Sequence, residues 1–178
     1  MNLIDALFDA SSASKRPIIA IDGPAGAGKT TLAEHLSAAL SLKYKCSVIH
    51  MDDLYNGWEN AFDHHLSESL LLAAQAHIKG RSISLPHYLW NRGEFSEPQE
   101  IKNCDLLIFE GVGSFQSIVR PYITASIWVE IDEGIGLKRV LSRDGDIHSM
   151  EMHQWLKAQA QHFLLEKSKE SADFILTT

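Results

Sequence analysis

Five short runs of apolar residues recur along the chain, separated by longer segments in which apolar residues return every three or four positions. The short runs are nearly continuous, as in IIAI at 18–21 and LLIF at 106–109, and such runs are typical of strands covered on both faces. The expected strands occupy residues 17–22, 47–52, 105–110, 126–131 and 173–176. The expected helices occupy residues 28–42, 64–79, 117–124, 134–141 and 150–169.

Strands that alternate with helices predict βαβ crossovers, and therefore a parallel sheet with helices on both faces. The 178 residues suffice for one buried core, so we expect a single domain over 1–178, of the three-layer α/β type with a five-stranded parallel sheet. Residues 1–14 are expected to form an N-terminal helix, because their apolar residues fall at helical spacing. Residues 81–103 are irregular and rich in proline and glycine, which is typical of a functional insert, here on the acceptor side.

Composition and charge limit the partners and the location that we expect for the protein. The formal net charge of -7 speaks against a nucleic-acid partner, whose phosphates attract a basic surface. No apolar run approaches the roughly 18 residues needed to cross a bilayer, and the N-terminus lacks the layout of a signal peptide. Cys46 and Cys104 have no CxxC spacing, which fits reduced thiols. We therefore expect a cytoplasmic protein without a nucleic-acid or membrane partner.

The segment GPAGAGKT at residues 23–30 matches the phosphate-binding pattern G-x-x-x-x-G-K-[ST], between an expected strand and an expected helix as the pattern requires. Its glycines let backbone N–H groups turn toward an anion, and the helix N-terminus faces the same anion. Lys29 supplies a positive charge for the terminal phosphates, and Thr30 a hydroxyl for Mg²⁺. The alternative is a glycine-rich turn that ends in Lys-Thr by chance. The predicted nucleotide contacts are Gly23, Pro24, Ala25, Gly26, Ala27, Gly28, Lys29, Thr30 and Thr31.

GTPases, ATPases and kinases of small molecules share this pattern, so other features of the sequence must distinguish these three classes. A GTPase would read guanine through an N-K-x-D stretch, and the sequence has none. Large mechanochemical ATPases usually have longer chains. A compact chain with a long irregular insert favours a kinase that acts on a small acceptor.

Acidic residues follow the second and third expected strands, at the sheet edge where ligands bind in parallel sheets. Asp52 is predicted to orient an acceptor hydroxyl and to take its proton. Asp53 is a candidate substrate contact or, alternatively, the cap of the next element. Glu110, at the start of EGVG, is predicted to hold Mg²⁺, the alternative being a surface acid after a strand. Thr30, Glu110 and Asp52 are therefore the candidate Mg²⁺ ligands.

Two arginines and several aromatic residues complete the candidate site. Arg139 and Arg143 are four residues apart and share a helix face, which predicts a short lid at 142–149 that closes over the transferring phosphates. The alternative is a solvated helix face on which Asp144 pairs with an arginine. Aromatic residues in the irregular parts could line an acceptor pocket by stacking, or could be ordinary packing. They are Tyr55, Trp58, Tyr88 and Trp90.

Taken in order, GPAGAGKTT, DDLY, PHYLW, EGVG, RVLSRD and ADFIL resemble the uridine kinase-like branch of the P-loop kinases, over residues 18–176. The resemblance implies a nucleoside monophosphate kinase-like P-loop fold that uses ATP. In the family motif D-S-[FY]-Y the Asp activates the acceptor hydroxyl; with the tyrosines matched, Asp52 takes that place and Tyr55 lines the acceptor site. Asp173 matches a late strand beside the adenine pocket. Leu89 stands where the family segment P-x-Y-D-F has Asp.

The sequence thus predicts an ATP- and Mg²⁺-dependent kinase that transfers the γ-phosphoryl group to a hydroxyl of a small molecule, a nucleoside or a similar polyol. Two alternatives stay open. One is a nucleotide-binding regulatory or accessory ATPase without an acceptor, which Leu89 favours. The other is a kinase of another hydroxyl compound, such as pantothenate or a sugar. The predicted catalytic residues are Lys29, Asp52, Arg139 and Arg143, the last two matching the family's lid arginines. The predicted acceptor contacts are Asp53, Tyr55, Tyr88, Trp90 and Arg92.

Overall fold

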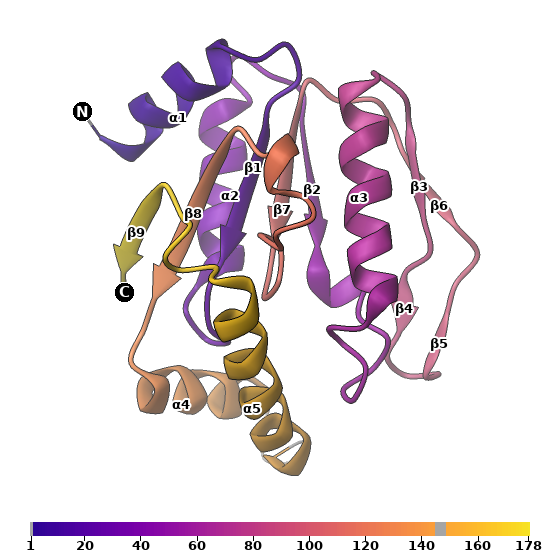
Figure 1. Ribbon diagram of the computed structural model, residues 1–178, viewed down its shortest axis with the longest axis vertical. Coiled ribbons are helices and arrows are strands. Elements are labelled where there is room, and N and C mark those ends of the chain that lie inside the picture. Colours follow the sequence, from indigo (N-terminus) through magenta and orange to yellow (C-terminus); the bar gives the residue numbers. More distant parts are fainter. Residues whose placement is uncertain (1, 145–148) are drawn as a thin grey trace.

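A central five-stranded sheet organises the computed structural model, which describes residues 2–144 and 149–178 (Figure 1). The strand order is β2-β7-β1-β8-β9, and every neighbouring pair is parallel. The strands are β1 Ile18–Asp22, β2 Cys46–His50, β7 Leu106–Glu110, β8 Ala125–Glu130 and β9 Phe174–Thr177. The predicted three-layer α/β fold with a five-stranded parallel sheet is confirmed.

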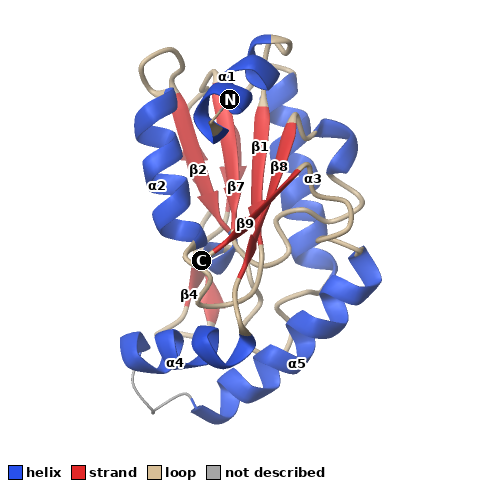
Figure 2. Ribbon diagram, turned by 90° about the vertical axis from the view of Figure 1, so that its left-hand side faces the viewer, coloured by secondary structure: helices blue, strands red, loops and turns tan. Residues whose placement is uncertain are grey.

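Helices cover both faces of this sheet (Figure 2). Helices α1 Leu3–Ser12 and α2 Lys29–Leu40 lie on one face, and α3 His64–Ile78 lies on the other. In β7, the side chains of Leu106 and Ile108 belong to the core under α1 and α2, while the alternate residues of the strand belong to the core under α3. Because both faces are covered, the four successive residues from Leu106 to Phe109 are all apolar, which explains the continuous run in the sequence.

All five strands end at the same edge of the sheet, where α4 Glu133–Asp144 and α5 Ser149–Glu166 lie (Figure 1). The loop after β1, the 3-10 turn η1 Met51–Asp53 after β2 and the loop after β7 meet at this edge. Parallel sheets bind their ligands at this edge. None of the helices in the described ranges is long and apolar enough to span a membrane.

The irregular segment 81–103 folds into two small antiparallel pairs. They are β3 Ile83–Leu85 with β6 Gln99–Ile101, and β4 Tyr88–Leu89 with β5 Glu94–Phe95. Ile83 and Leu85 are buried in the core beside α3, so the insert is anchored to the sheet domain.

The prediction of a helix at 117–124 is wrong. This segment contains only the short 3-10 turn η2 Arg120–Tyr122. Pro121 explains the difference, because proline has no N–H to donate to the carbonyl four residues earlier and its ring clashes with that carbonyl.

Candidate active site

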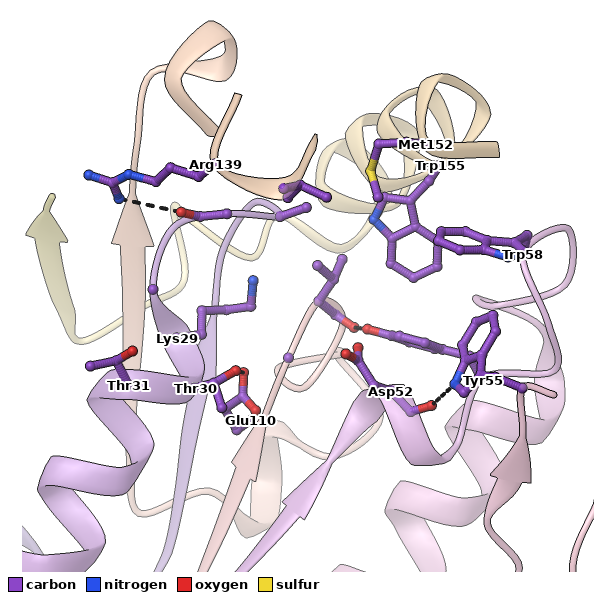
Figure 3. Close-up of a pocket in the computed structure, with 17 residues that line it drawn as sticks. Lys29, Thr30, Thr31, Asp52, Tyr55, Trp58, Glu110, Arg139, Met152 and Trp155 are labelled. Atoms are coloured by element: carbon purple, nitrogen blue, oxygen red, sulfur yellow. Dashed lines mark hydrogen bonds between the residues drawn. The ribbon is translucent and has the colours of Figure 1, made fainter. Parts of the chain in front are cut away.

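A pocket of about 370 Å³ opens at the carboxyl edge of the sheet (Figure 3). The phosphate loop and the start of α2 form one side, and η1, the loop after β7 and α5 form the other. The pocket brings together eleven of the predicted site residues from distant parts of the chain. They are Ala25, Gly26, Gly28, Lys29, Thr30, Thr31, Asp52, Tyr55, Trp90, Glu110 and Arg139.

The phosphate loop lies in backbone contact with α4. Gly26 has φ +78°, and a Cβ added to it would lie 2.3 Å from the carbonyl oxygen of Gly136 in α4. No other residue fits there without moving the helix. Lys29 is buried, and its ammonium donates to the carbonyl of Pro24 at 2.8 Å, so it lies folded over the loop. The N-terminus of α2 and the residue that carries this ammonium therefore line one side of the pocket, which suits a chain of phosphates.

Thr30 and Glu110 meet across the pocket floor. The Thr30 hydroxyl donates to Glu110 Oε1 at 3.1 Å, and the other oxygen of this buried carboxylate lies 2.7 Å from His50 Nδ1. This hydrogen bond to Glu110 raises the pKa of His50. A hydroxyl and a carboxylate side by side are the oxygen donors that Mg²⁺ prefers. Among the described residues, no group of three or more His, Cys, Asp and Glu side chains could hold a metal ion.

Two adjacent aspartates point in different directions. The carboxylate of Asp52 lines the pocket and points toward the same space as Lys29 (Figure 3). Asp53, contrary to its predicted substrate contact, lies outside the pocket, with Oδ2 3.9 Å from Nδ1 of His87. The tight 3-10 turn that follows β2 separates the two side chains. Of the pair, Asp52 is the carboxylate placed to meet an acceptor.

Aromatic side chains form the wall around Asp52. Tyr55 is buried, and its hydroxyl donates to the carbonyl of Val112 at 2.8 Å. The indole N–H of Trp90 donates to the backbone carbonyl of Asp52 at 3.0 Å. Trp155 of α5 packs edge-on against Tyr55, with ring centroids 4.8 Å apart. The side of the pocket opposite the phosphate loop is therefore aromatic, and the carboxylate of Asp52 lies beside these rings.

Two other predicted acceptor contacts lie outside the pocket. Tyr88 packs edge-on against Trp90, with ring centroids 5.1 Å apart, and is not among the residues that line the pocket. Arg92 is exposed, with its guanidinium 3.9 Å from the carboxylate of Glu94. Neither side chain lines the pocket, so direct acceptor contacts from Tyr88 and Arg92 are not borne out.

The predicted place of Asp173 beside the nucleotide is also wrong. Its carboxylate accepts from the backbone N–H of Ser126 at 2.8 Å and from the Ser126 hydroxyl at 2.7 Å. Ser126 lies at the start of β8, so Asp173 braces β9 at the amino end of the sheet, away from the phosphate loop. Thr178, after β9, lies at the other end, where its hydroxyl donates to the carbonyl of Ala27 at 3.1 Å.

Of the two predicted lid arginines, Arg139 has a described side chain. Arg139 lies over the phosphate loop, with Nη1 3.4 Å from the carbonyl oxygen of Gly26, and its guanidinium points away from Asp52 (Figure 3). It is therefore on the nucleotide side of the pocket. The side chain of Arg143 and residues 145–148 of the expected lid at 142–149 lie outside what the structure describes, so their roles stay predictions.

Asp22, at the end of β1, is a site residue that sequence reasoning missed. Its fully buried carboxylate accepts N–H bonds from Gly23 at 2.8 Å, Gly113 at 3.0 Å and Phe115 at 3.2 Å. It thereby joins the first residue of the phosphate loop to the loop that follows Glu110. The signal in the sequence is an acid that ends an apolar strand directly before a glycine.

Asp22 should give the stability of the protein a distinct pH dependence. Burial raises the pKa of its carboxyl from 3.8 to about 6, outweighing the three N–H bonds and the nearby charge of Lys29. The folded protein then holds a proton that the unfolded chain has lost, so stability falls as pH rises from about 4 to about 6. The difference corresponds to roughly 3 kcal/mol, because one pKa unit is worth about 1.4 kcal/mol.

Urea unfolding of the wild type and of Asp22→Asn at several pH values between 4 and 7 measures this contribution. The difference between the two free energies of unfolding cancels the groups that both proteins share. We expect the wild type to lose stability relative to the variant as pH rises. A difference that stays constant over this range would contradict the raised pKa.

Gln159 and Met152 of α5 are further residues that the sequence did not reveal. The side-chain oxygen of the buried Gln159 accepts the N–H of Ala25 in the phosphate loop at 3.1 Å. Met152 lines the pocket together with Trp155, three residues along the same helix. Their spacing marks them only as one face of a helix, and no local signal shows which loop that face meets.

Comparison with known proteins agrees with this geometry. A family described as an AAA domain matches residues 19–157. A uridine kinase of Mycoplasma genitalium is 28% identical over 180 residues, covering 89% of this chain and 84% of that protein. A cytidylate kinase of Solibacter usitatus is 37% identical over 81 residues, covering 43% of this chain and 34% of that protein.

A solved structure shares the fold along nearly the whole chain. It is that of a possible uridine kinase from Bacillus stearothermophilus, with a TM-score of 0.65 and 23% identity, covering 97% of this chain and 96% of that one. At this identity the likeness is one of fold. The chain therefore belongs to the AAA domain family, and the resemblance to uridine kinase-like P-loop kinases that the sequence predicted is confirmed.

Proposed function

We propose that the protein is an ATP- and Mg²⁺-dependent kinase that transfers the γ-phosphoryl group to a hydroxyl of a small molecule with a ring and a polyol part, as in a nucleoside. The observation that carries the proposal is that Lys29 and Thr30 of the phosphate loop line the same pocket as Asp52. A phosphate cradle and a carboxylate at one cavity suit in-line phosphoryl transfer.

Each residue then has a defined task. Lys29 and the loop N–H groups bind the phosphates of the nucleotide and neutralise their charge. Asp52 orients the acceptor hydroxyl and takes its proton, as the acceptor oxygen bonds to the γ-phosphorus and the bond to the bridging oxygen of the β-phosphate breaks. Thr30 and Glu110 would hold Mg²⁺, which supplies charge neutralisation between the phosphates. ADP and the phosphorylated acceptor leave.

The charges around the pocket support an acceptor without a phosphate group. Among its described lining residues, the cationic side chains are Lys29 and Arg139, and both contact the phosphate loop. The acceptor side offers Asp52 and aromatic rings instead. Phosphate recognition in proteins relies on arginine, lysine or clustered N–H groups, so this side favours a free hydroxyl compound, as in the uridine kinase relative, over a nucleotide.

A panel of acceptors tests the proposal. The protein is incubated with MgATP and, in separate reactions, with nucleosides, nucleoside monophosphates, sugars and pantothenate, and phosphorylated products are detected by mass spectrometry. We expect a product with a hydroxyl compound that has a ring and no phosphate, and none with the monophosphates. ATP hydrolysis that is indifferent to every acceptor would instead support the regulatory ATPase.

A further inference from the structure

The hairpin of β4 and β5 reaches the turn that carries Asp52. Trp90 directly follows β4 and lines the pocket, and its indole N–H donates to the backbone carbonyl of Asp52 at 3.0 Å (the dashed line beside Asp52 in Figure 3). The two residues are 38 positions apart in the chain. Proton transfer by Asp52 involves its carboxylate, whereas this bond is made to the backbone of the same residue.

The hydrogen bonds within the turn η1 go to a different carbonyl. The N–H groups of Leu54 and Tyr55 both donate to the carbonyl of Met51, at 2.8 and 3.1 Å. The indole of Trp90 donates to the next carbonyl, that of Asp52. Because the peptide unit is planar and rigid, a bond to this carbonyl fixes the plane of the whole unit and with it the backbone angle ψ of Asp52. The bond therefore limits the directions in which the Asp52 side chain can leave the backbone.

Neighbouring rings hold the indole of Trp90 in place. Trp58 packs edge-on against it with ring centroids 5.2 Å apart, and Tyr88 does so at 5.1 Å. Tyr88 packs edge-on against Phe95 of β5 at 5.2 Å. The ring of Phe95 lies 4.4 Å from that of His65 in α3, again between centroids. A chain of ring contacts thus connects the donor to a helix that covers the sheet.

Trp90 and His87 both approach the turn, but at different distances. His87 lies directly before β4, and its Nδ1 is 3.9 Å from Oδ2 of Asp53, which is beyond hydrogen-bond distance. Trp90 reaches the carbonyl of Asp52 at 3.0 Å. The hairpin therefore makes its directed contact with the residue whose carboxylate lines the pocket.

The orientation of Asp52 matters for the proposed reaction. A general base acts only within hydrogen-bond reach of the proton that it takes, and a misplacement of about 1 Å can lower a rate by about 100-fold. Asp52 is exposed and belongs to a turn of three residues, so burial of its own side chain does not fix it. A bond to its backbone supplies the missing constraint.

We propose that Trp90 is a positioning residue for the phosphoryl transfer, whose indole N–H holds the backbone of Asp52 so that the carboxylate meets the acceptor hydroxyl. This inference rests on the proposed kinase function and adds a residue to the same site. Trp90 neither takes the proton nor binds the phosphates; it acts through Asp52.

Trp90→Phe tests the inference, because it removes the N–H and keeps an aromatic ring between Trp58 and Tyr88. Steady-state kinetics are measured with MgATP and uridine, cytidine, fructose or pantothenate, and the compound that the wild type phosphorylates fastest is used for every variant. We expect kcat to fall roughly 3- to 10-fold, as for the loss of one hydrogen bond. The acceptor KM and the affinity for MgATP should stay unchanged, because the bond orients the base and binds neither ligand.

A double-mutant cycle with Asp52→Asn shows through which group Trp90 acts. The base is already lost in Asp52→Asn, so adding Trp90→Phe should lower kcat no further. If Trp90 only stabilised the fold or contacted the acceptor directly, its substitution would lower kcat or raise the acceptor KM in both backgrounds. Trp90 is 41% exposed, so the variants should remain folded, which thermal unfolding curves check.

Tyr88→Phe is the matched control. It removes a polar group from the same hairpin, next to Trp90 but outside the pocket, and keeps the ring that packs against the indole. Its kcat should equal that of the wild type. An equal loss in Tyr88→Phe and Trp90→Phe would overturn the inference, because any disturbance of the hairpin would then have the same effect.

The other outcomes separate this inference from the proposed function. An unchanged kcat in Trp90→Phe, a change confined to the acceptor KM, or a full further loss of kcat in the Asp52→Asn background would each overturn the positioning role and leave the kinase function standing. If the wild type phosphorylates none of the four compounds, the proposed function is overturned, and the positioning role with it.

Discussion

Asp52→Asn should lower kcat by about 10²–10⁴-fold, the range that removal of a general base covers, while the affinity for MgATP stays nearly unchanged. Asparagine has almost the same shape as aspartate but cannot take the proton of the acceptor hydroxyl. Asp52 lines the acceptor side of the pocket, across from the phosphate loop. The effect should therefore appear in turnover, measured by steady-state kinetics, and not in nucleotide binding, measured by calorimetry.

The neighbouring residue provides the control. Asp53 has the same side chain on the same turn but lies outside the pocket, near His87. Asp53→Asn removes the same charge one residue away and should keep kcat close to that of the wild type. Equal losses in the two variants would mean that net charge near η1, and not proton transfer by Asp52, limits the reaction.

Lys29→Ala should weaken nucleotide binding by roughly 10- to 100-fold, because hydrogen bonds to charged groups contribute about 1.5–3 kcal/mol. The buried Lys29 ammonium lies over the phosphate loop, bonded to the carbonyl of Pro24. Isothermal titration calorimetry with MgATP measures the loss. The variant's thermal unfolding curve shows whether the loop that this lysine closes stays folded.

Lys43→Ala is the matched control for charge. Lys43 is an exposed lysine just beyond the C-terminus of α2, at the opposite end of the helix from the phosphate loop. Its removal should leave the affinity for MgATP unchanged. If Lys29→Ala bound MgATP as tightly as Lys43→Ala, the loop would not be a phosphate site.

The fold followed from the sequence because its signals are local. The continuous apolar run that became β7 and the glycine pattern after β1 each depend on a few adjacent residues. Pro121 shows the limit of such patterns. The apolar spacing around it indicates a helix, but its missing N–H allows only a 3-10 turn.

The site was predictable where residues lie at or just beyond the carboxyl end of a strand, as Glu110 and Asp52 do. It was not predictable where the partner lies far along the chain. Gln159 reaches Ala25 across 134 positions of sequence, and Trp155 joins a wall that begins at Tyr55. The prediction that Asp173 lies beside the nucleotide failed for a related reason. A residue's proximity to a late strand in the sequence does not show at which end of that strand its side chain lies.

Helix α5 belongs to both halves of the pocket, since it gives Gln159 to the N–H of Ala25 and Trp155 to the aromatic wall. A phosphate that captured this N–H would release the glutamine from the loop, and Trp155, four residues earlier on the same helix, carries part of the acceptor wall. The two ligands would then share a coupling free energy, which thermodynamics requires to be reciprocal. If bound nucleotide raises the affinity for the acceptor by some factor, bound acceptor must raise the affinity for the nucleotide by the same factor.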